Sequence, residues 1–174
     1  GILCLVALLV LINFNFFTII IALASMPLAF TYPLMKRLTY WPQLFLGITF
    51  NYGLILGWTS INAEINLLPL IFYFGAIFWT LGYDTIYGFQ DIKDDEIIGL
   101  KSTSIKFKSN PIIFLYICYT VLLLSLIVVG YLNEFSNLYF IFLVIIIYQM
   151  YILQIKKFNP SEPLSCYKIF KSNN

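Results

Sequence analysis

The stretch PIIFLYICYTVLLLSLIVVGYL, residues 111–132, decides the fold class, because it carries no charged side chain over its whole length. A helix needs about 20 consecutive apolar residues to cross the ~30 Å hydrocarbon layer of a bilayer. Asn110 and Pro111 are typical of the N-cap and first turn of a helix, so we expect a helix to begin there. The stretch therefore predicts a transmembrane helix.

Further apolar segments lie on both sides of this stretch. The predicted spans are 1–12, 16–34, 42–59, 67–83, 111–132 and 138–155. Hydrophobic residues make up 61 % of the chain and charged residues 10 %, against about 45–50 % and about 25 % in soluble domains. β-Barrel strands would instead show short alternating segments. We predict an all-α integral membrane protein, a multi-helix transmembrane bundle forming one domain over residues 1–174.

The ten basic residues follow the second, fourth and sixth predicted spans. The connections without a basic residue are 13–15, 60–66 and 133–137. Lys and Arg are enriched in the cytoplasmic loops of membrane proteins. The loops that we therefore expect on the cytoplasmic side are 35–41, 84–110 and 156–171.

Other residues limit the possible metal and disulfide sites and indicate how the helices bend and pack. The chain has no His, and its three Cys show no Cys-x-x-Cys spacing, so neither a zinc site nor a disulfide framework is expected. Pro27 predicts a kink, and Gly53-x-x-x-Gly57 predicts close helix packing. The chain opens without Met inside an apolar run and stops after residues resembling the start of a helix, so we expect further segments on both sides.

Five of the eight acidic residues gather between the fourth and fifth predicted spans: Asp84, Asp91, Asp94, Asp95 and Glu96. On one continuous helix, Asp84, Tyr87, Asp91 and Asp95 would share a face. A divalent cation would relieve their repulsion, and Mg²⁺ takes one or two carboxylates together with water and substrate phosphates. A solvated acidic loop is the plainer interpretation. Asp84 disfavours this interpretation, because Asp84 directly follows a predicted span, where ionisable residues are costly and usually functional.

Three stretches resemble motifs of the UbiA-type prenyltransferases. Residues 83–103 read Tyr-Asp-Thr-x-Tyr-x-x-x-Asp-x-x-Asp-Asp-x-x-x-Gly-x-Lys-Ser-Thr, similar to the second aspartate-rich motif in the 4-hydroxybenzoate branch of that family. Residues 32–37 read YPLMKR and are followed by Pro42 and Gln43, similar to a second family signature. Residues 166–174 are similar to the stretch that leads into the family's last helix.

The resemblance implies nine transmembrane helices, of which this chain would supply helices three to eight. It also implies two aspartate-rich motifs facing each other across a central cavity. The first of them, of the Asn-Asp-x-x-Asp-x-x-x-Asp kind, is absent here and is expected upstream of Gly1. The implied activity is Mg²⁺-dependent transfer of a polyprenyl group from polyprenyl diphosphate to the ring of 4-hydroxybenzoate, a step of ubiquinone biosynthesis. The expected location is a bacterial cell inner membrane, with the active site facing the cytoplasm.

The resemblance also assigns roles to individual residues. The expected metal ligands are Asp91 and Asp95, with Asp94 beside them. The residues expected to bind the diphosphate are Lys36, Arg37 and Lys101, although Lys36 and Arg37 could be topology anchors alone. The expected catalytic residues are Asp84, which would orient or deprotonate the acceptor hydroxyl, and Tyr87, which would line the cavity or touch the diphosphate.

Two alternatives stay open at the level of sequence. The first is another member of the same family, of the menaquinone, haem O or chlorophyll type. The second is a transporter or channel whose acidic cluster handles cations. The acids lie at the end of a predicted span, whereas transporter sites lie near the bilayer midplane, and this disfavours the second alternative.

Overall fold

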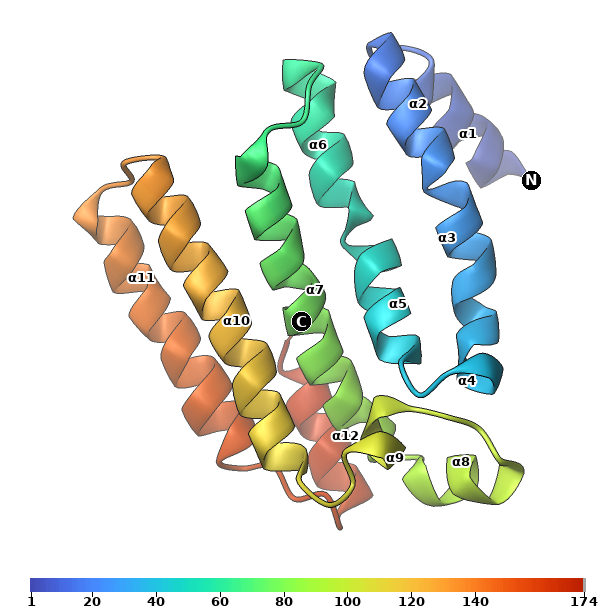
Figure 1. The fold of residues 1–174 in the computed structure, drawn as a ribbon, viewed down its shortest axis with the longest axis vertical. Helices are drawn as coiled ribbons and strands as arrows, with labels where there is room; N and C mark the ends of the chain where they lie inside the picture. Colours follow the sequence, from blue (N-terminus) through green and yellow to red (C-terminus); the bar gives the residue numbers. More distant parts are fainter. Residues whose placement is uncertain (174) are drawn as a thin grey trace.

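The chain folds into helices joined by short connections (Figure 1). The computed structural model describes residues 1–173, and no strand occurs among them. The helices are α1 (Ile2–Leu11), α2 (Phe16–Ala24), α3 (Met26–Thr31), the 3₁₀-helix η1 (Tyr32–Leu34), α4 (Met35–Leu38), α5 (Pro42–Phe50), α6 (Tyr52–Asn62), α7 (Leu67–Gly88), α8 (Ile92–Ile98), α9 (Thr103–Lys106), α10 (Pro111–Leu132), α11 (Asn137–Ile147), the π-helix η2 (Tyr148–Ile155) and α12 (Pro163–Lys171).

Five stretches are long and apolar enough to cross a membrane: Phe16–Leu38, Pro42–Asn62, Leu67–Gly88, Pro111–Leu132 and Asn137–Ile155. Many large apolar side chains on them are exposed, such as Phe30, Ile113 and Ile141, as expected where lipid is the solvent. The first predicted span forms the ten-residue helix α1, which extends over only about 15 Å at 1.5 Å per residue. The predicted class, an all-α integral membrane protein, is confirmed.

Two of the membrane-spanning stretches are interrupted. The first is broken at Ser25, two residues before Pro27. The second is broken at Asn51, whose buried amide Nδ2 donates to Gly47 O at 2.8 Å and to Thr80 Oγ1 at 2.7 Å. Since Thr80 belongs to α7, the Asn51 side chain ties the break between α5 and α6 to α7.

Helix α7 lies at the centre and packs on α10 and α5 through glycines. A Cβ atom at Gly75 would lie 1.7 Å from Ser125 Oγ, and one at Gly47 would lie 2.8 Å from the carbonyl oxygen of Ile77. The predicted packing motif finds no partner within residues 1–173, because Gly53 and Gly57 are exposed there and have no heavy atom within 4 Å of such a Cβ. Periodicity alone could not distinguish a glycine facing a helix from one facing lipid.

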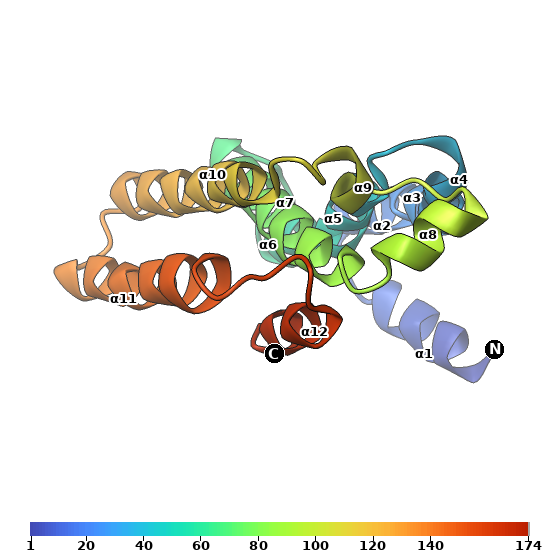
Figure 2. The ribbon, with the colours of Figure 1, turned by 90° about the horizontal axis from the view of Figure 1, so that it is seen from below.

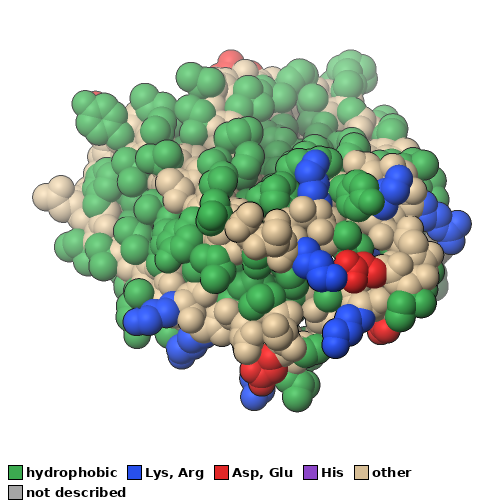
Figure 3. Space-filling model, turned by 60° about the horizontal axis from the view of Figure 1, so that its bottom comes forward, with side chains coloured by type: hydrophobic (Ala, Val, Ile, Leu, Met, Phe, Trp, Pro, Cys, Tyr) green, Lys and Arg blue, Asp and Glu red, His purple; other side chains and the backbone are tan. Residues whose placement is uncertain are grey.

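The three basic connections meet at one end of the molecule. Figure 1 places α4, α8, α9 and the connection between η2 and α12 at its lower end. Figure 3, in which this end comes forward, shows Lys and Arg side chains gathered there. Figure 2, seen from below, shows α10, α7 and α5 in one row, with α11 and α12 together on one side of it. The arrangement has the one-sided charge that the predicted topology requires.

The cytoplasmic orientation of this basic end is a testable prediction. Cysteines placed at Lys93 and Lys157 should react with a membrane-impermeant maleimide only from the cytoplasm. Cysteines at Asn62 and Asn137 should react only from the opposite side, and all four positions are exposed. The measurement is labelling of intact and permeabilised cells or organelles.

The native cysteines define the background for this experiment. Cys4 is exposed and must be replaced first. Cys166 is buried, and burial raises the pKa of its thiol, so that its reactive thiolate is scarce. Labelling of both pairs of positions from one side would overturn the predicted topology.

Candidate functional site

The basic end holds a cavity of about 300 Å³ between α4–α5 and α7–α8. We call it the acidic cavity, and its lining residues are Tyr32, Pro33, Lys36, Pro42, Gln43, Leu46, Asp84, Tyr87, Gly88, Asp91 and Asp95. Five predicted site residues are among them: Lys36, Asp84, Tyr87, Asp91 and Asp95. Two motifs that are far apart in the sequence therefore line one cavity.

The acidic residues reach this cavity from two helices. Helix α7 continues to Gly88, so that Asp84 and Tyr87 lie in its last turns, beyond the predicted end of the span at residue 83. The chain then leaves the helix, and α8 begins at Ile92, immediately after Asp91. The predicted single helical face is therefore wrong. The break turns the chain so that Asp91 and Asp95 still line the cavity beside Asp84.

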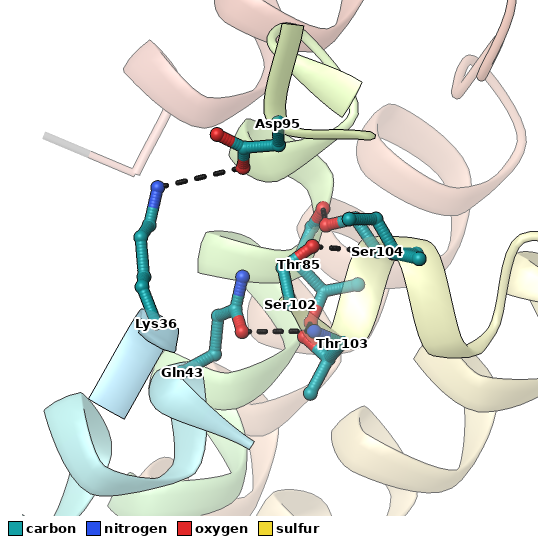
Figure 4. Close-up of polar contacts among 8 residues, drawn as sticks. Lys36, Gln43, Thr85, Asp95, Ser102, Thr103 and Ser104 are labelled. Carbon is teal, nitrogen blue, oxygen red and sulfur yellow. Dashed lines mark hydrogen bonds and ion pairs between the residues drawn. The ribbon is translucent and has the colours of Figure 1, made fainter. Parts of the chain in front are cut away.

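Asp95 is buried and faces Lys36 across the cavity (Figure 4). Lys36 Nζ lies 3.5 Å from Asp95 Oδ2, and this oxygen has no hydrogen-bond partner among the described residues. The two observations agree, because the ion pair is longer than a good N–H···O hydrogen bond. A buried carboxylate oxygen without a hydrogen bond is costly unless a ligand or cation completes its surroundings.

The acidic pair fits a metal ion that is shared with a substrate. Within residues 1–173, no group of three or more His, Cys, Asp or Glu side chains could hold a metal ion by itself. Asp91 and Asp95 nevertheless line the same cavity, and Asp95 Oδ2 is free of hydrogen bonds. Mg²⁺ usually takes one or two carboxylates and completes its shell with water and substrate phosphates, so this pair supplies the number of carboxylates that such a site uses.

Three predicted site residues lie outside this lining. Arg37 and Asp94 are exposed, and neither forms an ion pair within the described part of the chain. Lys101 contacts α4: its backbone N–H donates to Lys36 O at 2.8 Å, and its Nζ donates to Leu38 O at 3.2 Å. Lys101 thus holds the backbone of the lysine that faces Asp95.

The Lys-Ser-Thr end of the motif continues into a buried hydrogen-bond network (Figure 4). Thr103 N–H donates to Gln43 Oε1 at 3.0 Å, and the hydroxyls of Thr103 and Thr85 lie 2.6 Å apart. Ser104 Oγ donates to Thr85 O at 2.8 Å. A Cβ at Gly88 would lie 2.3 Å from Ser104 Oγ, so only glycine permits this approach. The network joins α5, α7 and α9 behind the acidic cavity.

Two more cavities continue from the acidic cavity into the membrane-spanning part. The aromatic cavity, of about 310 Å³, is lined by Leu46, Phe50, Trp79, Tyr83, Asp84, Phe170 and Asn173. The apolar cavity, of about 430 Å³, is lined by Asn51, Leu54, Phe72, Ala76, Trp79, Leu122, Leu126, Ile145, Ile146, Gln149, Met150 and Asn173. Asp84 and Leu46 border the first two cavities, and Trp79 and Asn173 border the last two. The three cavities are therefore neighbours in series.

Phe170 and Gln43 are two of the lining residues to which the sequence pattern assigned no role. Phe170 of α12 lies with its ring centroid 4.6 Å from that of Tyr87 and 5.8 Å from that of Tyr83. Gln43 stands in the quoted signature and is buried against the cavity. A polar residue inside an apolar span was the available signal for Gln43. Nothing in the local sequence predicted that α12 would reach α7.

The chain is similar to a known family of membrane enzymes. The chain matches the UbiA prenyltransferase family over residues 1–174. It is 39 % identical over 170 residues to 4-hydroxybenzoate polyprenyltransferase, mitochondrial, of Drosophila melanogaster, covering 96 % of this chain and 43 % of that protein. The protein of the same name from Rattus norvegicus is 52 % identical over 104 residues, covering 58 % and 27 %. The 4-hydroxybenzoate geranyltransferase 2 of Lithospermum erythrorhizon is 39 % identical over 171 residues, covering 94 % and 54 %.

The chain spans about half the length, or less, of these relatives. No solved structure matches it significantly. The family match extends over every residue of the chain, and the acidic cavity gathers the residues of the two motifs that carried the resemblance. The chain belongs to the UbiA prenyltransferase family.

Proposed function

We propose that the whole protein transfers a polyprenyl group from polyprenyl diphosphate to the aromatic ring of 4-hydroxybenzoate, a step of ubiquinone biosynthesis. The observation that carries this proposal is the series of three cavities, acidic, aromatic and apolar. A donor with a charged head and a long apolar chain matches this order of surroundings. The relatives named above are 4-hydroxybenzoate prenyltransferases by name, which supports the same acceptor.

The acidic cavity receives the diphosphate head. Lys36, from α4, supplies a positive charge, and Asp91 and Asp95, at the start of α8, supply the carboxylates that would hold Mg²⁺. When bound, Mg²⁺ neutralises the charge that develops on the diphosphate as the allylic C–O bond breaks. The Lys36 ammonium group lies 3.5 Å from Asp95 Oδ2 and has three N–H donors, so it is placed to contact phosphate oxygens bound beside that carboxylate.

The acceptor ring reacts at the border between the acidic and aromatic cavities. Asp84 lines both cavities, so it is placed to orient or deprotonate the phenolic hydroxyl of the acceptor. The ring carbon ortho to the hydroxyl forms the new C–C bond with the prenyl C1 carbon, diphosphate leaves, and the ring loses the proton of that carbon. Tyr87, packed on Phe170, forms the wall beside the diphosphate.

The remaining predicted residues receive roles that follow from their positions. We propose that Lys101 acts through α4, because its hydrogen bonds hold the backbone around Lys36. Exposed Arg37 and Asp94 would act on the approach of the head group or on a further ligand shell.

The alternatives lose support in this comparison. The cation-transporter alternative does not follow from membership in a prenyltransferase family. The menaquinone, haem O and chlorophyll types have no counterpart among the three relatives described above, all named for 4-hydroxybenzoate. The bacterial inner membrane stays a prediction, because the animal relatives are mitochondrial by name.

The activity can be tested on the full-length protein in membranes or nanodiscs. Given a prenyl diphosphate, 4-hydroxybenzoate and Mg²⁺, it should form a prenylated 4-hydroxybenzoate that mass spectrometry detects. Excess EDTA should abolish the product, and added Mg²⁺ should restore it. The reason is that, without a cation, the two carboxylates repel the diphosphate. Prenylation of another aromatic acid in preference to 4-hydroxybenzoate would overturn the acceptor assignment. Equal product in EDTA would overturn the metal assignment.

A further inference from the structure

The polar side chain of Gln43 lines the acidic cavity and has no role in the proposed mechanism. It lies in the first turn of α5, directly after Pro42, and only 3 % of it is exposed. It lines the acidic cavity from α5, whereas the carboxylates line it from α7 and α8. A buried amide needs partners for both its oxygen and its nitrogen.

The orientation of the Gln43 amide follows from its contact with Thr103. A backbone N–H can only donate, so the atom that accepts from Thr103 N at 3.0 Å must be the amide oxygen, Oε1. The –NH₂ group then points away from Thr103. Figure 4 shows the nitrogen turned toward the side where Lys36 and Asp95 face each other. Within residues 1–173, no hydrogen-bond acceptor pairs with this nitrogen.

The surroundings of Thr103 and Gly88 favour this orientation. Thr103 is itself held by the hydroxyl of Thr85 at 2.6 Å. Gln43 Nε2 lies beside Gly88, 3.2 Å from where a Cβ of that residue would be, so the nitrogen occupies the end of α7 at the cavity wall. The bond to Thr103 therefore orients the –NH₂ group before any ligand arrives, which lowers the entropy lost on binding.

The charges of the cavity show which ligand these donors suit. Among the residues that line it, three carry carboxylates, Asp84, Asp91 and Asp95, and Lys36 carries an ammonium group. An anionic head group needs hydrogen-bond donors in addition to a cation held by the carboxylates, and the lining residues Lys36 of α4 and Gln43 of α5 carry such donors. We infer that Gln43 is a substrate-binding residue whose –NH₂ group donates hydrogen bonds to diphosphate oxygens, with Thr103 as the residue that positions the amide. This inference rests on the proposed function for the identity of the anion.

The decisive variant is Gln43→Glu in the full-length protein. A glutamate keeps an oxygen for the Thr103 N–H but replaces the two donors by an anionic oxygen. The dissociation constant for inorganic diphosphate in the presence of Mg²⁺, measured by calorimetry in detergent, should rise about 10- to 100-fold. The KM for prenyl diphosphate should rise in parallel, while the KM for 4-hydroxybenzoate should change less than about twofold. The matched control is Asn62→Asp, the same amide-to-acid change at the exposed far end of α6, which should leave diphosphate binding unchanged.

A second variant separates the loss of donors from added repulsion. Gln43→Met has a similar length and no charge, and it should weaken diphosphate binding about 3- to 10-fold. If Gln43→Met binds diphosphate as tightly as the parent, the donor role is overturned, whatever Gln43→Glu does. If Gln43→Glu fails to fold, Gln43→Met alone decides the question.

These measurements distinguish a failure of the Gln43 assignment from a failure of the proposed function. Unchanged diphosphate binding in both variants, with prenyl transfer intact in the parent, would overturn only the role of Gln43. Weakened diphosphate binding in a protein that prenylates no aromatic acid would overturn the proposed reaction and leave the role of Gln43 standing.

Discussion

Asp91→Asn and Asp95→Asn in the full-length protein are each expected to lower the rate of prenyl transfer by about 10²–10³-fold. Both carboxylates line the acidic cavity, and Asp95 Oδ2 has no hydrogen bond among the described residues that would hold it for a structural purpose. Losing one of two protein ligands weakens stabilisation of the charge that develops as diphosphate leaves. The measurement is incorporation of radiolabelled 4-hydroxybenzoate into lipid at saturating substrate and at increasing Mg²⁺.

Asp94→Asn is the matched control for these variants. It makes the same change within α8, but Asp94 is exposed and lies outside the described lining of the acidic cavity. We expect less than about a tenfold loss of rate, since exposed charges interact weakly through water. High Mg²⁺ should partly rescue Asp91→Asn and should not affect Asp94→Asn. Parental rates for both Asp91→Asn and Asp95→Asn would show that the metal is held elsewhere.

Gly75→Ala is expected to destabilise the fold by about 1–3 kcal/mol, the usual cost of overpacking. Helix propensity alone would make the alanine variant more stable by about 1 kcal/mol. We expect the opposite change in stability. The reason is steric: a Cβ at this position would lie 1.7 Å from Ser125 Oγ and 2.7 Å from Ser125 Cβ, where α7 and α10 meet. Ser125 Oγ could rotate away, but its Cβ could move only with the backbone of α10. The measurement is the thermal midpoint in detergent, followed by circular dichroism.

Gly57→Ala is the control, and for this variant we expect no loss of stability. Gly57 lies in α6, is exposed, and has no neighbouring heavy atom of the described residues within 4 Å of an added Cβ. The substitution should leave the thermal midpoint unchanged or raise it slightly, because only helix propensity changes. A lower midpoint for Gly57→Ala than for Gly75→Ala would mean that Gly53 and Gly57 are packed against another helix, as the sequence pattern predicted.

The sequence by itself determined the class of the protein and much of the candidate site. In a bilayer, each spanning segment must satisfy its backbone hydrogen bonds internally, so the uncharged run at 111–132 was sufficient to predict a helix. The basic residues predicted a one-sided distribution of charge, and the structure gathers them at one end. The two motifs identified Lys36, Asp84 and Asp95 as candidates before any contact between them was known.

Only the tertiary structure decided which candidates meet. The contact of Phe170 with Tyr87 and the orientation of the Gln43 amide both depend on helices that are distant in the sequence. The same holds for Lys101, a predicted phosphate ligand whose hydrogen bonds go to the backbone around Lys36. The physical reason is that burial in lipid makes each helix nearly independent of its neighbours. Close packing between helices then determines which residues face one another, and a local sequence pattern does not predict this packing.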